Sequence, residues 1–357
     1  MNTVVRGPGR RNSRHRGVNI ALQGGGAHGA FTWGVLDKFF EDDRLWIDAI
    51  SGTSAGAMNT VVAAHGMHEH GAVGARQKLS EFWTEVSRAA QASPLQRSLW
   101  AKATGSWSLE TSPGYHWMNF AQRVASPYDL NPFHYNPLRD VLERVVDFER
   151  VQRCTDMGVF ISATNVESGR VKVFERAEIT LDSTMASACL PYLFQSVEID
   201  GVPYWDGGYM GNPPLFPFFH GSPSDDILIV QINPIARAGT PRRAADIQNR
   251  VNEITFNSAL MHELRSIDFV RRLLDAGQLD EKKYRRMNVH ILELCPQVAN
   301  LDASSKLNTE MAFFEHLFEI GRDAAGDWLK DNFENLGVRS STDLSGMFDT
   351  MAVLPEA

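Results

Sequence analysis

Cysteine is scarce in this 357-residue chain, which contains only Cys154, Cys189 and Cys295. Three cysteines that lie far apart fit neither a disulfide framework nor a CxxC metal or redox site. We therefore expect a protein of a reducing compartment and predict a cytoplasmic location.

Long apolar runs are missing as well. No stretch approaches the roughly 18 consecutive apolar residues of a membrane-spanning helix, and the N-terminus lacks the apolar run of a secretory signal. No Asp-x-Asp-x-Asp-Gly calcium loop occurs, and the spacing of His65, His68 and His70 does not place three imidazoles on one helix face. We expect neither a transmembrane helix nor a signal peptide, and no metal or other cofactor.

Acidic side chains outnumber basic ones, 43 to 35, and the net charge is −8. Residues 1–16 are the exception, because they carry five arginines and no acid. We predict that they form a disordered basic tail, which could contact the surface of an anionic membrane. The acidic remainder argues against a nucleic-acid partner.

Short apolar runs that alternate with helical patterns predict the fold class. Residues 18–22 have the pattern of a strand, followed by a glycine turn and a helix at 30–40; a second strand at 47–50 precedes a helix at 55–64. This alternation predicts an α/β protein with three α/β/α layers and a mainly parallel central sheet. Further strands are expected at residues 158–163, 171–174, 227–232 and 289–294.

Two regions depart from this alternation. Residues 91–137 combine five prolines with many aromatic side chains, which is typical of a loop-rich, lid-like insertion. Beyond Pro241, apolar residues recur at three- and four-residue steps or their sums from Ile247 to Leu274, including Val251 and Ile254, and form one amphipathic face. We predict that residues 236–357 form a helical C-terminal extension whose apolar face packs on the sheet.

The segment Gly52-Thr53-Ser54-Ala55-Gly56 follows the second predicted strand and begins a predicted helix. A GxSxG pattern in this setting is typical of a nucleophile elbow, because small neighbours permit a strained turn that exposes the serine hydroxyl. The helix N-terminus favours developing negative charge and offers the N–H of Ala55. Ser54 is therefore the candidate nucleophile, and Gly52 and Gly56 support its turn.

The first glycine turn, Gly24-Gly25-Gly26-Ala27-His28-Gly29, also matches the GxGxxG pattern of dinucleotide-binding proteins. Such a site needs an acidic residue at the end of the second strand to hold the ribose hydroxyls. Ser51-Gly52-Thr53-Ser54 occupies that strand end instead. We therefore interpret Gly24, Gly25 and Gly26 as N–H donors to an oxyanion, together with Ala55.

Taken in order, these patterns resemble those of the patatin-like phospholipase family. That family has a GGGxRG-like loop, a GxSxG elbow, a segment reading ASxAxPxxF, and DGG or DGA. This chain has Gly24–Gly29, Gly52–Gly56, Ala186-Ser187-Ala188-Cys189-Leu190-Pro191-Tyr192-Leu193-Phe194 and Asp206-Gly207-Gly208 in the same order. The resemblance covers residues 17–235, which we predict to be the catalytic domain.

The resemblance implies a lipid acyl hydrolase, related to phospholipase A or lysophospholipase, that uses a Ser–Asp dyad. Ser54 would attack the ester carbonyl, Asp206 would accept its proton, and water would release the acyl-enzyme. Gly29, Gly207 and Gly208 support the motifs around this dyad. An aspartate at its free pKa of about 3.9 is a feeble base, so the site must desolvate Asp206 or couple proton transfer to attack.

Two residues depart from the family pattern. Cys189 replaces a fixed alanine, a change between small residues that we interpret as packing. His28 occupies the place where the family usually has Arg or Lys. Either His28 is a cation that titrates near neutral pH beside the glycine loop, or it merely packs that loop.

Other interpretations remain open. A Ser-His-Asp esterase or thioesterase, or a polyester depolymerase, would draw its histidine from those after Asp206: His220, His262, His290 and His316. A non-catalytic lipid-binding protein with the same fold is an alternative of another class. In each case the expected partner is a lipid or an amphiphilic ester, and the sequence does not predict the oligomeric state.

Overall fold

The computed structural model describes residues 15–294, 298 and 301–349, so almost all of the predicted basic tail and Cys295 lie outside the described residues. Within the described part of the chain, a sheet of eight strands forms the centre of the molecule. The strands are β1 (Arg16–Leu22), β2 (Leu45–Gly52), β3 (Gly158–Asn165), β4 (Val171–Glu175), β5 (Val197–Ile199), β6 (Val202–Asp206), β7 (Asp226–Gln231) and β8 (Asn288–Glu293).

The sheet is mostly parallel, as the alternation of strands and helices predicted. Its order is β5-β6-β3-β2-β1-β7-β8, and β4 pairs with β3 beside this path. The five neighbouring strands β3, β2, β1, β7 and β8 run parallel. Strands β4 and β6 pair antiparallel with β3, and β5 pairs antiparallel with β6. All six predicted strands are present. Strand β6, which ends at Asp206, was not predicted, because its five residues include a proline and a charged residue.

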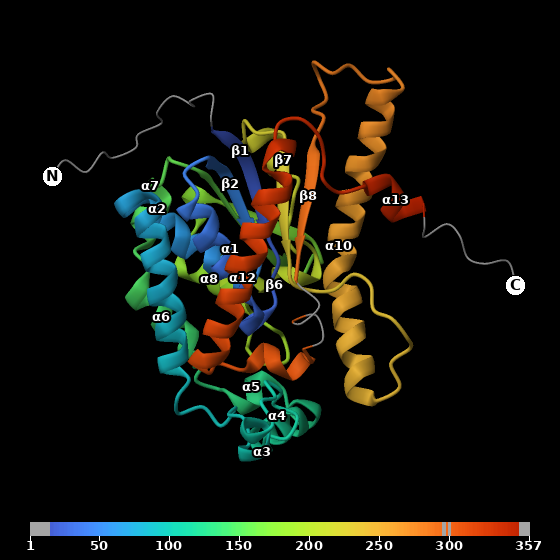
Figure 1. Ribbon diagram of the computed structural model, residues 1–357. Helices are drawn as coiled ribbons and strands as arrows, with labels where there is room; N and C mark the ends of the chain where they lie inside the picture. Colours follow the sequence, from blue (N-terminus) through green and yellow to red (C-terminus); the bar gives the residue numbers. More distant parts are fainter. Residues whose placement is uncertain (1–14, 295–297, 299–300, 350–357) are drawn as a thin grey trace, which may run out of the picture.

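Helices cover both faces of the sheet. Alternate residues of each strand point to opposite faces, so Ile20 and Leu22 belong to one apolar core and Ala21 to the other. The first core also receives α1 (Gly29–Glu41), α2 (Ala55–Ala89) and α12 (Met311–Asn332), and the second receives α10 (Ala244–Asp275) and α13 (Leu344–Asp349). Figure 1 shows α1 and α12 on one side of the strands and α10 on the other. The three-layer α/β/α prediction is confirmed.

Shorter elements complete the chain. They are α3 (Leu99–Ala103), α4 (Pro113–Val124), α5 (Pro127–Leu130), α6 (Pro137–Val145), α7 (Phe148–Arg153), α8 (Leu181–Ser187), α9 (Phe218–Gly221), and the 3-10 turns η1 (Gly26–His28), η2 (Arg176–Glu178), η3 (Gly207–Tyr209), η4 (Ala303–Leu307) and η5 (Phe333–Asn335). Helices α3, α4 and α5 of the predicted insertion gather at one end of the molecule (Figure 1). None of the helices in the described ranges combines the length and the apolar character needed to cross a membrane.

The C-terminal region is helical, as predicted, and it is joined closely to the rest of the protein. Helices α1 and α12 approach so tightly that a Cβ atom on Gly34 would lie 2.0 Å from the carbonyl oxygen of Phe318. Strand β8 extends the parallel sheet beyond β7. The boundary that we predicted near residue 235 is not tested by these contacts and stays a prediction.

The amphipathic face predicted for α10 is only partly correct. Its second half buries Leu264 and Ile267 against the sheet, but Ile247, Val251 and Ile254 in the first half are about half exposed. The first half instead buries polar residues, because this part of the helix extends past the apolar sheet face and reaches the cavity described below.

Candidate active site

Ser54 lies in the sharp turn between β2 and α2. Its backbone has φ 55° and ψ −121°, a conformation that is strained for any residue with a side chain. Glycines on both sides permit this turn: a Cβ atom on Gly52 would lie 2.3 Å from the Gly56 carbonyl oxygen, and one on Gly56 would lie 2.3 Å from that of Leu22. The strand, strained serine and helix form the arrangement expected of a nucleophile elbow.

Asp206 is the last residue of β6 and is fully buried. Its Oδ1 accepts a hydrogen bond of 2.7 Å from the N–H of Gly208, and its own carbonyl oxygen accepts one of 2.8 Å from the Thr164 hydroxyl. Its Oδ2 accepts no hydrogen bond from any described residue. One carboxylate oxygen is thus fixed, while the other remains available.

Burial raises the pKa of Asp206 to about 7, although the Gly208 N–H and the nearby Ser54 hydroxyl both act to lower it. Removing a carboxylate from water disfavours its charged form, and here this effect outweighs the Gly208 hydrogen bond and the proximity of Ser54. We expected Asp206 to act as a base either if it is desolvated or if proton transfer is coupled to attack. The structure shows a desolvated Asp206, with a pKa close to neutral pH.

Ser54 and Asp206 line one cavity of about 600 Å³. Strand β6 runs antiparallel to β3 and pairs Asp206 with Ala163, two residues beyond the partner of Gly52 on β2, so the two side chains meet although 152 positions separate them. The segment Ala186–Phe194 holds both of them. The Ser187 hydroxyl accepts the Ser54 N–H at 3.0 Å, and the Cys189 carbonyl oxygen accepts the Asp206 N–H at 2.8 Å. Cys189 is buried, as its interpretation as a packing residue predicted.

The glycine loop after β1 borders the same cavity. Gly24 lies against the elbow, since a Cβ atom there would be 2.6 Å from the Cβ of Ser54. Its N–H, however, donates to Asn212 Oδ1 at 2.7 Å and is therefore not free for an oxyanion, contrary to our expectation. The N–H groups of Gly25 and Gly26 donate to no described residue. Ala55 also has an unused N–H at the start of α2, but it does not line the cavity.

The sequence model of the family described as "Patatin-like phospholipase" matches residues 20–219, which is more than half of the chain. The chain belongs to the patatin-like phospholipase family. The matched segment contains the glycine loop, the elbow and Asp206, and the predicted enzyme class, a lipid ester hydrolase, agrees with this family. A comparison with curated protein sequences found no significant match.

Solved structures with some similarity include those of two bacterial proteins. VipD from Legionella pneumophila is 12% identical, with a TM-score of 0.38 over 87% of this chain and 67% of its own. ExoU in its heterodimeric complex with SpcU, from the type III secretion system of Pseudomonas aeruginosa, is 14% identical, with a TM-score of 0.38. A structure of the type III effector ExoU alone is 15% identical, with a TM-score of 0.33. These two cover 90% and 89% of this chain, which spans about half of theirs.

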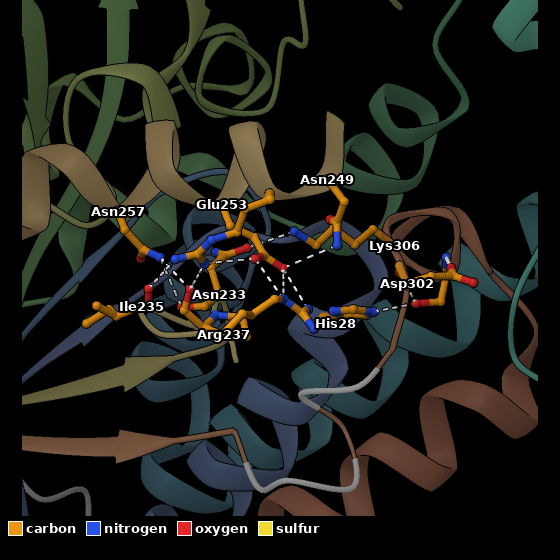
Figure 2. A network of polar contacts seen from close by, with 12 residues as sticks. His28, Asn233, Ile235, Arg237, Asn249, Glu253, Asn257, Asp302 and Lys306 are labelled. Atoms are coloured by element: carbon orange, nitrogen blue, oxygen red, sulfur yellow. Dashed lines mark hydrogen bonds and ion pairs between the residues drawn. The ribbon is translucent and has the colours of Figure 1, made fainter. Parts of the chain in front are cut away.

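Residues beyond the segment that matches the patatin-like family also support the glycine loop. Asn233 Nδ2 donates to the Gly24 carbonyl oxygen at 2.7 Å, and Lys306 Nζ donates to Asn233 Oδ1 at 2.8 Å. Figure 2 shows Asn233, Lys306 and the buried Glu253 of α10 within one polar network. No sequence signal marked these residues, because each is a single polar side chain in a region without a motif.

Lys306 and Glu253 carry opposite charges in this network. Glu253 is buried and pairs with Arg237 at 2.7 Å and Arg250 at 3.1 Å. Lys306 lines the cavity wall, and desolvation lowers its pKa to about 8, while Glu253 acts in the opposite direction. A cation therefore does lie beside the glycine loop, but the C-terminal region supplies it.

His28 is buried and does not behave as the titrating cation that we considered. Desolvation, with smaller effects from Lys306 and Arg237, lowers the pKa of His28 to about 3, so the imidazole stays neutral at physiological pH. Its Nε2 lies 2.8 Å from the Ser305 hydroxyl, which itself donates to the Asp302 carbonyl oxygen. We therefore assign the proton of His28 to Nε2. The structure supports the alternative prediction, that His28 packs the loop.

The other histidines lie elsewhere. Among the described residues, none of the four candidates for a Ser-His-Asp arrangement lines the cavity: His220, His262, His290 and His316. His290 instead pairs with Asp226 at 3.0 Å inside the sheet. His65 is buried, whereas His68 and His70 are exposed, so these three imidazoles do not face one site. Non-helical backbone at His70 and Gly71 interrupts α2 at the last of these residues.

Proposed function

We propose that this protein hydrolyses carboxylic esters of lipids through a dyad of Ser54 and Asp206. The observation that carries the proposal is the meeting of a strained serine and a buried aspartate, with a pKa of about 7, at one cavity of a patatin-like chain. A base whose pKa lies near the working pH is the most effective at accepting a proton from a nucleophile.

In the first half of the reaction, Ser54 Oγ attacks the ester carbonyl carbon and its proton passes to Asp206. The free Oδ2 is the accepting atom, because Oδ1 already accepts the Gly208 N–H. As the tetrahedral intermediate collapses, the carbon–oxygen bond to the alcohol breaks, and Asp206 returns the proton to the departing oxygen. The products are a free alcohol, such as a lysolipid, and an acyl group on Ser54.

In the second half, water attacks the acyl carbonyl and Asp206 Oδ2 accepts the water proton. Collapse of this intermediate releases a carboxylic acid and returns the proton to Ser54 Oγ. We assign stabilisation of both oxyanions to the N–H groups of Gly25 and Gly26, which are unused and border the cavity. Gly24 contributes differently: its missing side chain lets the loop approach Ser54.

The cavity supports an amphiphilic ester as substrate. Its volume of about 600 Å³ is typical of a small-molecule site, and its lining includes aromatic and aliphatic side chains as well as polar ones. The aromatic and aliphatic ones include Tyr115, Phe120, Leu190, Leu193 and Phe256. Such apolar side chains suit an acyl chain, while the polar groups of the same lining suit the ester and headgroup.

The test compares the wild-type protein with Ser54→Ala and Asp206→Asn on nitrophenyl esters of increasing chain length and on mixed phospholipids. Each change is expected to lower kcat/KM by about a thousandfold or more, since the two residues act as one unit. Ser168→Ala and Asp200→Asn are matched controls on exposed turns. Asn tolerates the positive φ of 51° at position 200.

Two results would contradict the dyad. A folded Ser54→Ala protein within about tenfold of the wild-type rate would exclude Ser54 as nucleophile, since losing a catalytic unit costs far more. A wild-type protein that binds lipid but hydrolyses no ester would favour the non-catalytic lipid-binding alternative. Faster turnover of thioesters or short polyesters than of lipids would redirect the substrate while keeping the dyad.

A further inference from the structure

Exposed apolar side chains concentrate on the insertion. Among the described residues, nine of the 19 large hydrophobic side chains that are exposed lie between residues 99 and 135, a small fraction of the chain. Phe133 is 92% exposed, Leu99 86% and Trp100 71%. The others are Trp117, Phe120, Val124, Tyr128, Leu130 and Tyr135. We call these nine residues the insertion patch. A concentration of this kind marks an interaction site in a folded protein.

Helix α4 is oriented with its apolar face outward. Trp117, Phe120 and Val124 follow one another at three and four residues, so they share one face of the helix, and all three are exposed. Ala121 is the one buried residue of this helix. An amphipathic helix that packs on its own protein presents its apolar face to the core. The outward orientation of α4 therefore calls for an apolar surface outside this chain.

The insertion patch adjoins the entrance to Ser54. Phe120 belongs both to the outward face of α4 and to the lining of the catalytic cavity, and Tyr115 and Met118 of the same helix also line it. Tyr192, which is 71% exposed, lines the cavity from the segment that holds the dyad. Whatever covers the patch consequently lies against the mouth of the cavity.

We propose that the insertion patch docks on the surface of a phospholipid bilayer and brings the cavity mouth to the lipids there. This inference rests on the proposed function, because a lipid ester must leave its bilayer to reach Ser54. The composition fits that occupant. Tryptophan and tyrosine rings suit the boundary between acyl chains and headgroups. The exposed cation Arg123 lies on α4 beside the patch to meet phosphate groups, and the exposed Lys102, 3.8 Å from Glu310, lies on α3.

The test measures co-sedimentation of the full chain with vesicles of phosphatidylcholine, with and without phosphatidylglycerol. The variant Leu99→Ser with Phe133→Ser removes the two most exposed side chains, neither of which lines the cavity. It is expected to weaken vesicle binding by about tenfold or more, because both side chains would otherwise be buried in lipid. The matched control, Val338→Ser with Phe269→Ser, removes exposed apolar side chains elsewhere and is expected to bind like the wild type.

Turnover of a short, water-soluble nitrophenyl ester separates this proposal from the hydrolase itself. The Leu99/Phe133 variant is expected to keep this turnover while losing hydrolysis of vesicle lipids. A wild-type protein that cleaves the soluble ester but binds no vesicle would overturn docking and leave the dyad standing. A protein that binds vesicles through the patch but cleaves no ester would overturn only the dyad.

Two further results would overturn docking on lipid. Equal vesicle binding by the wild type and the Leu99/Phe133 variant would show that another surface meets the bilayer. Light scattering could show that the wild type is a dimer and the variant a monomer. If the wild type also bound no vesicles, this result would assign the patch to contact with a second copy of the chain. As an independent readout, quenching of tryptophan fluorescence by brominated lipids should fall when Trp100 and Trp117 are replaced by Phe.

Discussion

At the floor of the cavity, Asp206 is fully buried and is held by main-chain and side-chain hydrogen bonds from β3, η3 and the segment before β5. At its rim, α4 keeps its apolar face in solvent and buries a single alanine. The desolvated carboxylate at the floor lowers the free energy of unfolding at neutral pH. The rim gains no stability from its apolar side chains, because they stay exposed to water. Both regions depart from what stability alone would select, and in each the departure serves the site rather than the fold.

The rim is nevertheless anchored at a few points. Leu109 is buried, and its N–H donates to the Ser304 hydroxyl at 2.7 Å. Arg97 pairs with Glu310 at 2.6 Å and lies over the Trp107 ring. These contacts fix the base of the insertion to the C-terminal region, while all exposed rings of the insertion patch except Trp100 lie farther along the same segment. We therefore expect substitutions at the floor to change activity and stability much more than a substitution at the rim changes stability.

The largest effect should come from the charge of Asp206. Its raised pKa of about 7 means that the basic form is lost as pH falls, so kcat/KM should drop about tenfold per pH unit below pH 7 and reach a plateau above it. A rate profile for a soluble ester measures this. A plateau that extends down to pH 5 would show that Asp206 is not the base.

The same shift predicts a cost in stability. Because the folded pKa lies above the ordinary value of 3.8, Asp206 favours folding at low pH and loses that contribution as pH rises from about 4 through 7. At pH 8 the free energy of unfolding of Asp206→Asn should therefore exceed that of the wild type by on the order of a few kcal/mol. The variant should unfold at a correspondingly higher temperature. The gain should vanish near pH 4. Thermal unfolding at both pH values is the measurement.

A smaller effect is expected at the back of the glycine loop. Lys306→Met removes the donor to Asn233 Oδ1, and Asn233 in turn holds the Gly24 carbonyl oxygen. We expect kcat to fall by about tenfold with little change in KM, since a displaced oxyanion loop weakens the transition state more than substrate binding. Lys306→Arg should recover part of the loss. An unchanged kcat in the methionine variant would mean that Asn233 positions the loop without the lysine.

The smallest effect is expected at the rim. Phe133→Ser should change the free energy of unfolding by no more than about 0.5 kcal/mol, because the ring is almost fully exposed and buries nothing on folding. Denaturant unfolding of the single variant checks this. A loss of several times that amount would show that the ring packs on the protein, and it would remove the basis for the docking proposal.

Much of the site could be predicted from local patterns. The elbow is encoded by adjacent residues, since a strand, two glycines around a serine and a helix specify the turn by themselves. The polar partners could not be predicted in the same way. Ser187, Asn212 and Asn233 reach the elbow or the loop from positions more than 130 residues away, and no periodicity links them to it. The exposure of the first half of α10 could not be predicted for a related reason. The spacing of its apolar residues correctly predicted a helix, but these side chains do not pack on the sheet.

The sequence by itself determined the alternation of strands and helices that builds the parallel part of the sheet, the elbow at Ser54 and the motif that contains Asp206, because each follows from neighbouring residues and their steric preferences. Only the tertiary structure decided what these groups can do. The pKa of Asp206, the engaged N–H of Gly24 and the neutral state of His28 depend on burial and on contacts with distant segments. Desolvation and hydrogen bonding are properties of a site assembled in space, so they arise only when the sheet brings its strand ends together.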